Sequence, residues 1–251
     1  MKEQNRKIAI VTGVGNERGI GAATCRKLAC NGVDIFFTYW MSKDGWAEQF
    51  KSEIIELGVC CEYMEIDLSK ADAAERIMNE VTRKMDNPSI LVNNAAHSID
   101  VDYLQMNAKI LDDHYAVNVR STCLLCAEFA KRFNKVNHAY GRIINITSGQ
   151  DLGPMPGNLA YVASIGAISA FTVSLSAELA HLGITVNAVN PGPTDSNWMN
   201  EEIRENLRPK FLMGRVGEPE DAARVIFFLA SDEANWITGQ VIHSEGGFLR
   251  V

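Results

Sequence analysis

The sequence predicts a single α/β domain with one parallel sheet covered by helices on both faces. Apolar runs of strand length alternate with stretches of helix length along the whole chain. The strand-like runs are apolar throughout, which is typical of parallel strands that are buried on both faces. The length of 251 residues fits one domain of this kind, and the sequence contains no repeat, low-complexity segment or interdomain linker.

Strands and helices are expected to alternate through most of the chain. About seven strands are expected, over 7–13, 33–40, 59–68, 89–96, 141–148, 184–192 and 240–245. Helices are expected over 19–32, 44–57, 70–86, 111–135, 160–181, 197–208 and 218–231. Because parallel strands joined through helices connect by right-handed crossovers, this order predicts a doubly wound, Rossmann-type sheet.

The composition excludes some classes of partner. The formal net charge is −7, whereas proteins that bind nucleic acids or anionic membranes select basic surfaces. We therefore expect no nucleic-acid partner and no membrane partner. We find no apolar run near the length that spans a bilayer, and the N-terminal residues lead into a strand without a signal peptide's apolar region. A cytoplasmic protein is expected.

The six cysteines are not spaced like a disulfide framework or a zinc site. They form three pairs, each within one expected element: Cys25 and Cys30, Cys60 and Cys61, and Cys123 and Cys126. The last pair spells C-x-x-C but lies inside a helix, whereas a redox motif needs a helix N-terminus to stabilise its thiolate. Packing is the better interpretation, and it implies a reducing cytoplasm.

A glycine-rich turn, TGVGNERGIG, lies at residues 12–21 between the first strand and the first helix. Glycine permits a tight turn there and a close approach of the backbone to a pyrophosphate, which then lies at a helix N-terminus. Nucleotide binding through Gly13, Gly19, Ile20 and Gly21 is therefore favoured over a purely structural turn.

The end of the second strand and one arginine indicate the type of cofactor. Proteins that bind NAD usually carry an acidic residue there to bond the ribose 2′-hydroxyl, but this strand ends Phe37-Thr38-Tyr39. Arg18 has the charge to meet a 2′-phosphate, and a solvated loop arginine is the alternative. Thr38 and Arg18 together favour NADP(H), while nearby Asp44 weighs against it.

Further motifs follow in a fixed order: Asp67-Leu68 after the third strand, Asn93-Asn94-Ala95-Ala96, Asn118 in HYAVNVR, Ser148 in NITSG, Tyr161 in LAYVAS, and Pro191, Gly192 and Thr194 in NPGPT. With them the whole chain resembles the short-chain dehydrogenase/reductase family. The segments at 214–223 and 228–247 are similar to the C-terminal signature of its 3-oxoacyl-(acyl-carrier-protein) reductases.

The resemblance implies an NADP(H)-dependent reduction of a 3-oxoacyl-like ketone to a secondary alcohol, as in fatty acid biosynthesis. Tyr161 would supply the proton, Ser148 would hold the carbonyl oxygen, and Asn118 would hold a water of the proton relay. Cofactor contacts would come from Asp67, Leu68, Asn93, Ala95, Tyr161 and the segment 191–194. The family also implies a homotetramer in which helices 111–135 and 160–181 pack across one dyad, with Cys123 and Cys126 near that interface.

Two departures bear on the branch of the family. The glycine-rich turn is two residues longer than the usual T-G-x-x-x-G-x-G, a length reminiscent of enoyl reductases. Those enzymes carry a lysine seven residues after the tyrosine, where this chain has Ile168. Carrier-protein reductases often carry an arginine where this chain has Leu182, which weakens the case for a carrier-protein substrate over another small-molecule or acyl-thioester substrate.

The third departure lies in the catalytic motif. The family places a lysine four residues after the tyrosine, one helical turn away, where its charge lowers the phenol pKa. Here that residue is Ile165, within the otherwise matching YVASIGA, and no lysine occurs between Lys135 and Lys210. We expect the tyrosine pKa to rise and the ordinary reaction to be impaired.

Three interpretations remain open. The chain is an impaired reductase, or an NADP(H)-binding protein that serves as a sensor or partner subunit, or an enzyme with another proton source such as His97. The segment 194–212 is expected to form a substrate lid with an apolar side and a charged, solvated side. Its apolar side chains are Trp198, Met199, Leu207, Phe211 and Leu212, and its charges are Glu201, Glu202, Arg204, Glu205 and Arg208. Such segments usually order when substrate binds.

Overall fold

Seven parallel strands form one sheet at the centre of the computed structural model, which describes residues 6–133 and 140–250. The strands are β1 (Ile8–Val11), β2 (Asp34–Tyr39), β3 (Cys61–Glu65), β4 (Ile90–Asn93), β5 (Gly141–Ile146), β6 (Ile184–Asn190) and β7 (Val241–His243). Their order is β3-β2-β1-β4-β5-β6-β7, and each neighbouring pair is parallel. The chain changes direction across the sheet between β1 and β4, and ligands of such sheets bind outside the carboxyl ends of the strands at this point.

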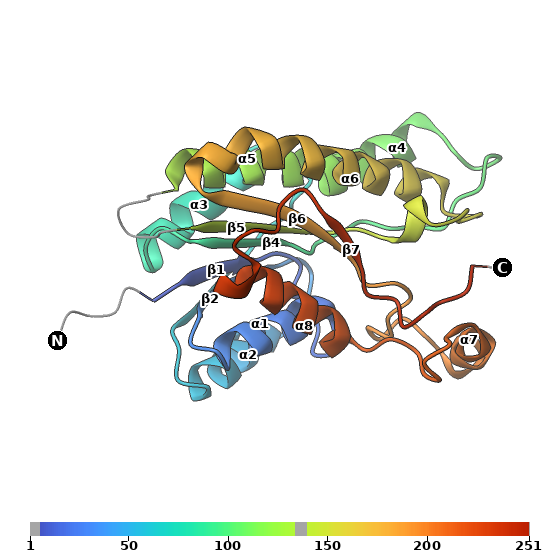
Figure 1. The fold of residues 1–251 in the computed structure, drawn as a ribbon, viewed down its shortest axis with the longest axis horizontal. Coiled ribbons are helices and arrows are strands. Elements are labelled where there is room, and N and C mark those ends of the chain that lie inside the picture. Colours follow the sequence, from blue (N-terminus) through green and yellow to red (C-terminus); the bar gives the residue numbers. More distant parts are fainter. Residues whose placement is uncertain (1–5, 134–139, 251) are drawn as a thin grey trace.

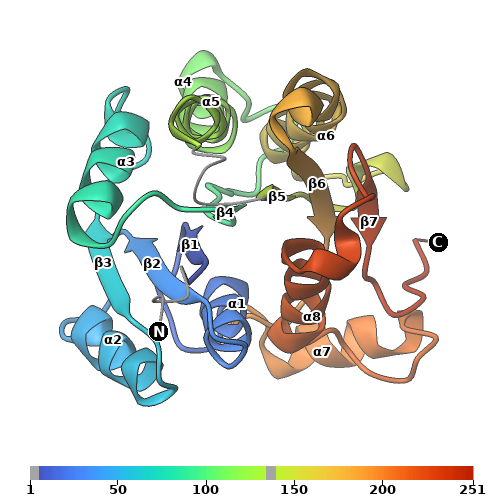
Figure 2. The same ribbon diagram turned by 60° about the vertical axis from the view of Figure 1, so that its left-hand side comes forward.

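Helices cover both faces of the sheet, which confirms the predicted fold class (Figure 1). One face carries α1 (Ile20–Ala29), α2 (Trp46–Glu56) and α8 (Pro219–Ala230). The other carries α3 (Ala73–Lys84), α4 (Ala108–His114), α5 (Thr122–Arg132) and α6 (Leu159–Leu179), as the turned view shows (Figure 2). The short helix α7 (Glu201–Leu207) lies beyond the carboxyl ends of the strands on the α8 side, near the C-terminus.

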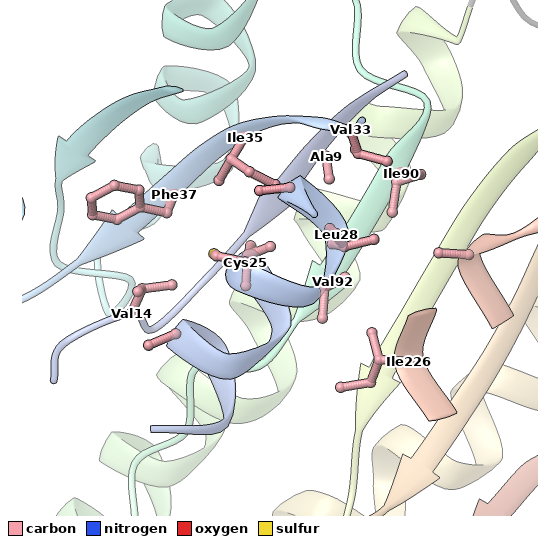
Figure 3. Packing of buried hydrophobic residues seen from close by; sticks show 14 of the residues in the cluster. Ala9, Val14, Cys25, Leu28, Val33, Ile35, Phe37, Ile90, Val92 and Ile226 are labelled. Carbon is pink, nitrogen blue, oxygen red and sulfur yellow. The ribbon is translucent and has the colours of Figure 1, made fainter. Parts of the chain in front are cut away.

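Alternate residues of the strands supply the two cores. Ala9 and Val11 of β1 pack in a cluster with Leu28 of α1 and Ile226 of α8 (Figure 3), whereas the intervening Ile8 and Ile10 face the α3 and α5 side. Burial of a side chain such as Leu28 stabilises the fold by about 1.5–3 kcal/mol. Both faces of the strand are therefore apolar, which is why the sequence shows continuous rather than alternating hydrophobic runs.

The helices expected over 111–135 and 197–208 begin at other residues than predicted. The helix expected over 111–135 begins earlier, at Ala108, because Asn107 caps it by accepting from Ile110 N at 3.1 Å; residues 134–135 lie outside the described part. Its middle, Tyr115–Ser121, is a π-helix. The helix expected over 197–208 begins only at Glu201, since Asn197 has a left-handed φ of 82°.

The helix α6 corrects the expectation about apolar runs. Leu159–Leu182 is long and apolar enough to cross a membrane by length and composition alone. Within its apolar 18-residue window, 33% is buried inside the structure. Its serine, threonine and glycine residues interrupt the large apolar side chains, which is why the run is easily missed. In the structure α6 packs along β6 and the π-helix, so it serves as a covering helix of the sheet.

Candidate active site at the carboxyl edge of the sheet

The glycine-rich turn between β1 and α1 forms a cradle that admits no side chain at two positions. Gly13 has a φ of 72°, and a Cβ there would lie 2.6 Å from the Cα of Ala95. A Cβ at Gly21 would lie 2.8 Å from Nδ2 of Asn94. Gly19 caps α1 and Ile20 is its first residue, so the free N–H groups of the helix start open on this cradle. The predicted residues thus fit a dinucleotide pyrophosphate.

Three residues that the sequence reasoning did not single out fix this turn. Thr12 Oγ1 accepts from Asn94 N and Ala95 N at 3.0 and 3.1 Å, and Asn94 Nδ2 donates to Thr12 O at 2.8 Å. Trp46 Nε1 donates to Val14 O at 3.0 Å. Thr12 and Asn94 stand beside recognised motif residues in the sequence, which is a usable signal, whereas the Trp46 contact depends on the packing of α2.

The expected ribose site at the end of β2 contains no carboxylate on that strand. Thr38 is buried, and its carbonyl accepts from Val14 N at 2.8 Å. Glu65, at the end of neighbouring β3, accepts from Met41 N at 3.3 Å. Asp44 is exposed in the loop that precedes α2.

Arg18 points to the other side of the cradle. Its guanidinium lies 3.5 Å from Asp195, which also pairs with Arg204 at 2.8 Å. Hydrogen bonding from Arg204 holds the pKa of Asp195 below its usual value, with a smaller contribution from Arg18. Because β2 and β6 lie on opposite sides of β1, this pairing directs Arg18 away from the expected 2′-phosphate position. A charged cavity of about 680 Å³ lies beside it, bordered also by Arg208 and Glu218.

The predicted lid is anchored at both ends. Trp198 is exposed but its Nε1 donates to Thr194 O at 2.7 Å, and Met199 and Phe211 are buried. Leu207 is partly buried and Leu212 is exposed. The charges Glu201, Glu202, Glu205 and Arg208 are exposed, as expected for a solvated side.

The loop after β6 is tightly turned. Gly192 has a φ of 63°, and Thr194 is buried with its hydroxyl donating to the carbonyls of Pro191 and Gly192 at 3.1 and 3.2 Å. Thr194 therefore shapes the loop itself. Ser196, two residues on, is the next hydroxyl and is only partly buried.

The side chains of Asn93 and Asp67 are committed to local structure. Asn93 Nδ2 donates to Asn145 Oδ1 at 2.9 Å and to Cys126 Sγ at 3.2 Å, so it ties β4 to β5 in the core rather than lining the crevice with its amide. Asp67 Oδ1 accepts from Ser69 N at 2.9 Å, and Leu68 is partly buried beside it. Ala95 is partly buried against Gly13.

Asn118, in the π-helix, joins the loop after β4 to α6. Its Oδ1 accepts from His97 N at 2.7 Å, and its Nδ2 donates to His97 O and to Ser164 Oγ, both at 2.9 Å. Ser164 Oγ in turn donates to Tyr161 O at 2.8 Å. Both donor hydrogens of the Asn118 amide are thus engaged by protein groups, and the chain of bonds reaches the predicted catalytic helix turn.

Ser148 and Tyr161 come together as predicted. Ser148 follows β5, where its hydroxyl donates to Met155 Sδ at 3.9 Å, and Tyr161 lies near the start of α6. Burial raises the pKa of Tyr161 above its ordinary value, and the nearby Ser148 hydroxyl opposes that shift only in part. No cation among the described residues contributes to this pKa.

Ile165 occupies the lysine position and is buried, with 3% of its surface exposed. It lies one helical turn after Tyr161 on the same side of α6. Ile165 supplies no charge one turn from the phenol, and burial raises the pKa of Tyr161.

His97 packs edge-on against His114, with ring centroids 4.6 Å apart. Burial, followed by the proximity of His114, lowers the pKa of His97 below its ordinary value. His97 is therefore neutral at neutral pH, and its ring has a nitrogen available to donate or accept a proton.

All six cysteines are free: Cys25, Cys61 and Cys126 are buried and Cys123 is partly buried, as packing predicts, whereas Cys30 and Cys60 are exposed. Cys126 is buried, and burial raises its pKa; burial also raises the pKa of Cys123. Cys30 is the C-cap of α1, and Cys60 precedes β3 rather than lying in it. Within residues 6–133 and 140–250, no group of three potential metal ligands is found.

Comparisons with known proteins agree with this arrangement. Residues 13–249 match the protein family described as enoyl-(acyl carrier protein) reductase. The uncharacterized oxidoreductase YjdA of Bacillus subtilis (strain 168) is 63% identical over 250 residues, which cover 100% of both chains. The 3-oxoacyl-(acyl-carrier-protein) reductase FabG of Aquifex aeolicus (strain VF5) is 32% identical over 245 residues, or 96% of each chain. A solved short-chain dehydrogenase/reductase from Serratia marcescens BCRC 10948 has a TM-score of 0.88 at 31% identity, covering 98% of this chain and 99% of that one.

Proposed function

This chain belongs to the short-chain dehydrogenase/reductase family and is an oxidoreductase that resembles 3-oxoacyl-(acyl-carrier-protein) reductases, and we propose that it is an NADP(H)-dependent ketone reductase whose activity is impaired by Ile165. A nicotinamide dinucleotide is the cofactor of the family, and it supplies the hydride when bound. The preference for NADP(H) is supported by the lack of a carboxylate on the end of β2 near Thr38. The Arg18–Asp195 pair gives that preference no support.

In the proposed reaction, Tyr161 Oη donates a proton to the oxygen of the reduced carbonyl while Ser148 Oγ holds the same oxygen. The apolar residues of the lid suit a 3-oxoacyl-like substrate. The observation that carries the proposal is the buried Ile165 beside a tyrosine whose pKa is raised. A cation about 4 Å from the phenol, at an effective dielectric constant of about 20, would contribute about 4 kcal/mol of gross Coulomb energy.

The test is the substitution Ile165→Lys, with NADPH-dependent reduction of a 3-oxoacyl thioester as the assay. We expect kcat/KM to rise by about 10²–10⁴. Ile165→Met is the matched control, because it keeps a long, uncharged side chain and should leave the rate unchanged. Tyr161→Phe, added to Ile165→Lys, should abolish the gain.

The pH profile of the reverse reaction provides a second readout. Oxidation of the alcohol needs Tyr161 deprotonated, so its rate rises with pH through the tyrosine pKa. In the native chain that pKa is raised, so the rate should still be rising at about pH 10, the ordinary tyrosine value. Ile165→Lys lowers the pKa and should move the plateau to lower pH. Equal turnover and equal profiles for native and Ile165→Lys proteins would refute the proposed role of this position.

The buried Ile165 also favours a second function, an NADP(H)-binding sensor or partner subunit without turnover. NADPH binding by both proteins with turnover by neither would identify this function. A native enzyme that is active but is inactivated by His97→Gln would instead indicate His97 as the proton source.

A further inference from the structure

Glu245 and Arg250 form a buried ion pair in the C-terminal tail, defined here as residues 244–250. Their side chains are 8% and 16% exposed, although both lie within seven residues of the chain end. The tail follows β7 and runs beside α7 at the end of the molecule (Figure 1). A charge pair that is largely removed from water is costly to desolvate, so the groups around it matter.

Arg250 lies in a slot made by two glycines next to the candidate catalytic serine. A Cβ at Gly149, the residue after Ser148, would overlap the Arg250 guanidinium, and a Cβ at Gly153 would lie 3.1 Å from Arg250 Cδ. Neither glycine has a positive φ, so the backbone conformation does not require glycine at these positions. With Arg250 in this position, a methyl group at residue 149 would have to displace the guanidinium, which is the end of a flexible side chain.

The carboxylate of Glu245 links the same pair to the loop after β6. Its Oε1 also accepts from Asn190 Nδ2 at 2.7 Å, and Asn190 Oδ1 accepts from Gly192 N at 2.9 Å. A Cβ at Gly192 would lie 2.9 Å from Glu245 Cγ. The ion pair therefore touches both the serine loop and the loop that the family places against the nicotinamide.

The rest of the tail is attached to the lid. Phe248 packs on Phe211 with ring centroids 4.9 Å apart, and Leu249 N donates to Lys210 O at 2.8 Å. The Arg250 guanidinium lies 5.3 Å from the centre of the Phe248 ring. These contacts hold the backbone of the tail in place, so that the Arg250 side chain reaches the slot.

We propose that Arg250 is a positioning residue that sets the spacing of the Ser148 loop and the Gly192 loop from the C-terminal tail. Its catalytic consequence rests on the proposed reductase function; its effect on the two loops does not. The planar guanidinium of Arg250 bonds the Glu245 carboxylate and at the same time fills the Gly149–Gly153 slot. The smaller ammonium group of a lysine cannot do both.

Hydrogen exchange of the unliganded protein, followed by mass spectrometry, tests the effect on the loops. Arg250→Ala should raise exchange in peptides that cover 148–153 and 190–194 and leave β2 and α2 unchanged. Arg250→Lys should have an intermediate effect, and it keeps the variant charged if Arg250→Ala does not fold. Arg83→Gln, which breaks an exposed pair with Glu80, is the control and should leave both loops unchanged.

Gly149→Ala provides a test from the other side of the contact. It should raise exchange in the same peptides when Arg250 is present, because the new methyl group displaces the guanidinium. In an Arg250→Ala background the same substitution should add nothing. Equal effects of Gly149→Ala in both backgrounds, or unchanged loops in Arg250→Ala, would overturn the proposal.

Turnover in the Ile165→Lys background tests the catalytic consequence. Arg250→Ala should lower kcat/KM by roughly 10–100-fold, the scale expected when a reacting group is displaced by about 1 Å, and should weaken NADPH binding by a smaller factor. If kcat/KM falls by this factor only because KM rises, Arg250 serves substrate binding. If the fall accompanies a change in oligomeric mass, Arg250 serves assembly. Either result would overturn the positioning role. If Ile165→Lys itself shows no turnover, the reductase function fails, and the exchange data still decide the role of Arg250.

Discussion

At the scale of single residues, the glycine-rich turn offers a matched pair of positions. Gly13 has a left-handed φ and no room for a Cβ beside Ala95. Gly15 has no positive φ, and a Cβ there would meet no atom within 4 Å. Both glycines belong to the same ten-residue turn. The structure therefore separates the glycine that the cradle requires from one that it tolerates.

Gly13→Ala should lower the free energy of unfolding by about 1–3 kcal/mol, the cost of a strained backbone conformation, and weaken NADPH binding by about tenfold or more, equivalent to about 1.4 kcal/mol. Gly15→Ala should change neither. Urea unfolding and fluorescence titration with NADPH measure the two effects. A Gly13→Ala protein that binds NADPH like the native chain would show that the cradle does not hold the cofactor.

The places of the candidate catalytic residues in the fold could be predicted. The family resemblance gave Ser148 after the fifth strand and Tyr161 and Ile165 one turn apart on the following helix, and the structure has Ser148 after β5 and the other two on α6. The direction of a long side chain was not predictable: the sequence suggests that Arg18 faces the end of β2, and it instead pairs with Asp195. Arg250 gave no sequence signal, since its slot is formed by glycines about a hundred residues earlier in the chain.

At the scale of elements, all seven strands were predicted, because most are apolar runs between turns and the mixed run at β3 alternates with helices in the same order. The π-helix was not predicted. A π-helix differs from an α-helix by a shift in hydrogen-bond register that leaves the hydrophobic pattern almost unchanged, and such turns often occur at functional sites. Here the wider turn carries Asn118, which joins the His97 loop to α6.

Asn118→Leu should destabilise this junction. The substitution leaves the N–H and C=O of His97 and the Ser164 hydroxyl without their partner, and a buried polar group left unpaired costs about 1–3 kcal/mol. We expect a loss of that size in the free energy of unfolding by urea. Asn79→Ala, which removes an exposed partner of Arg132, should stay within about 0.5 kcal/mol of the native protein. Equal stability of the two variants would contradict a junction role for Asn118.

At the scale of the whole molecule, α6 presents an apolar face that residues 6–133 and 140–250 leave exposed. Ala163, Ala167, Ala170, Val173 and Ala177 are exposed along it, at spacings that place them along one side of a helix. Exposed apolar patches of this kind mark contact sites between proteins. The family resemblance implies a homotetramer with this helix across a dyad, and the exposed face supports that expectation.

Ala170→Arg should therefore disrupt assembly, because it places a charge and a long side chain where small residues let two helices approach. Light scattering with size-exclusion chromatography should give four times the chain mass of 27.7 kDa for the native protein and a smaller species for the variant. Ser52→Arg, on the exposed side of α2, is the matched control and should not change the mass. A native monomer, or a variant as large as the native protein, would show that α6 is not the contact surface; its apolar face would then have to be covered by something other than a second copy of this chain.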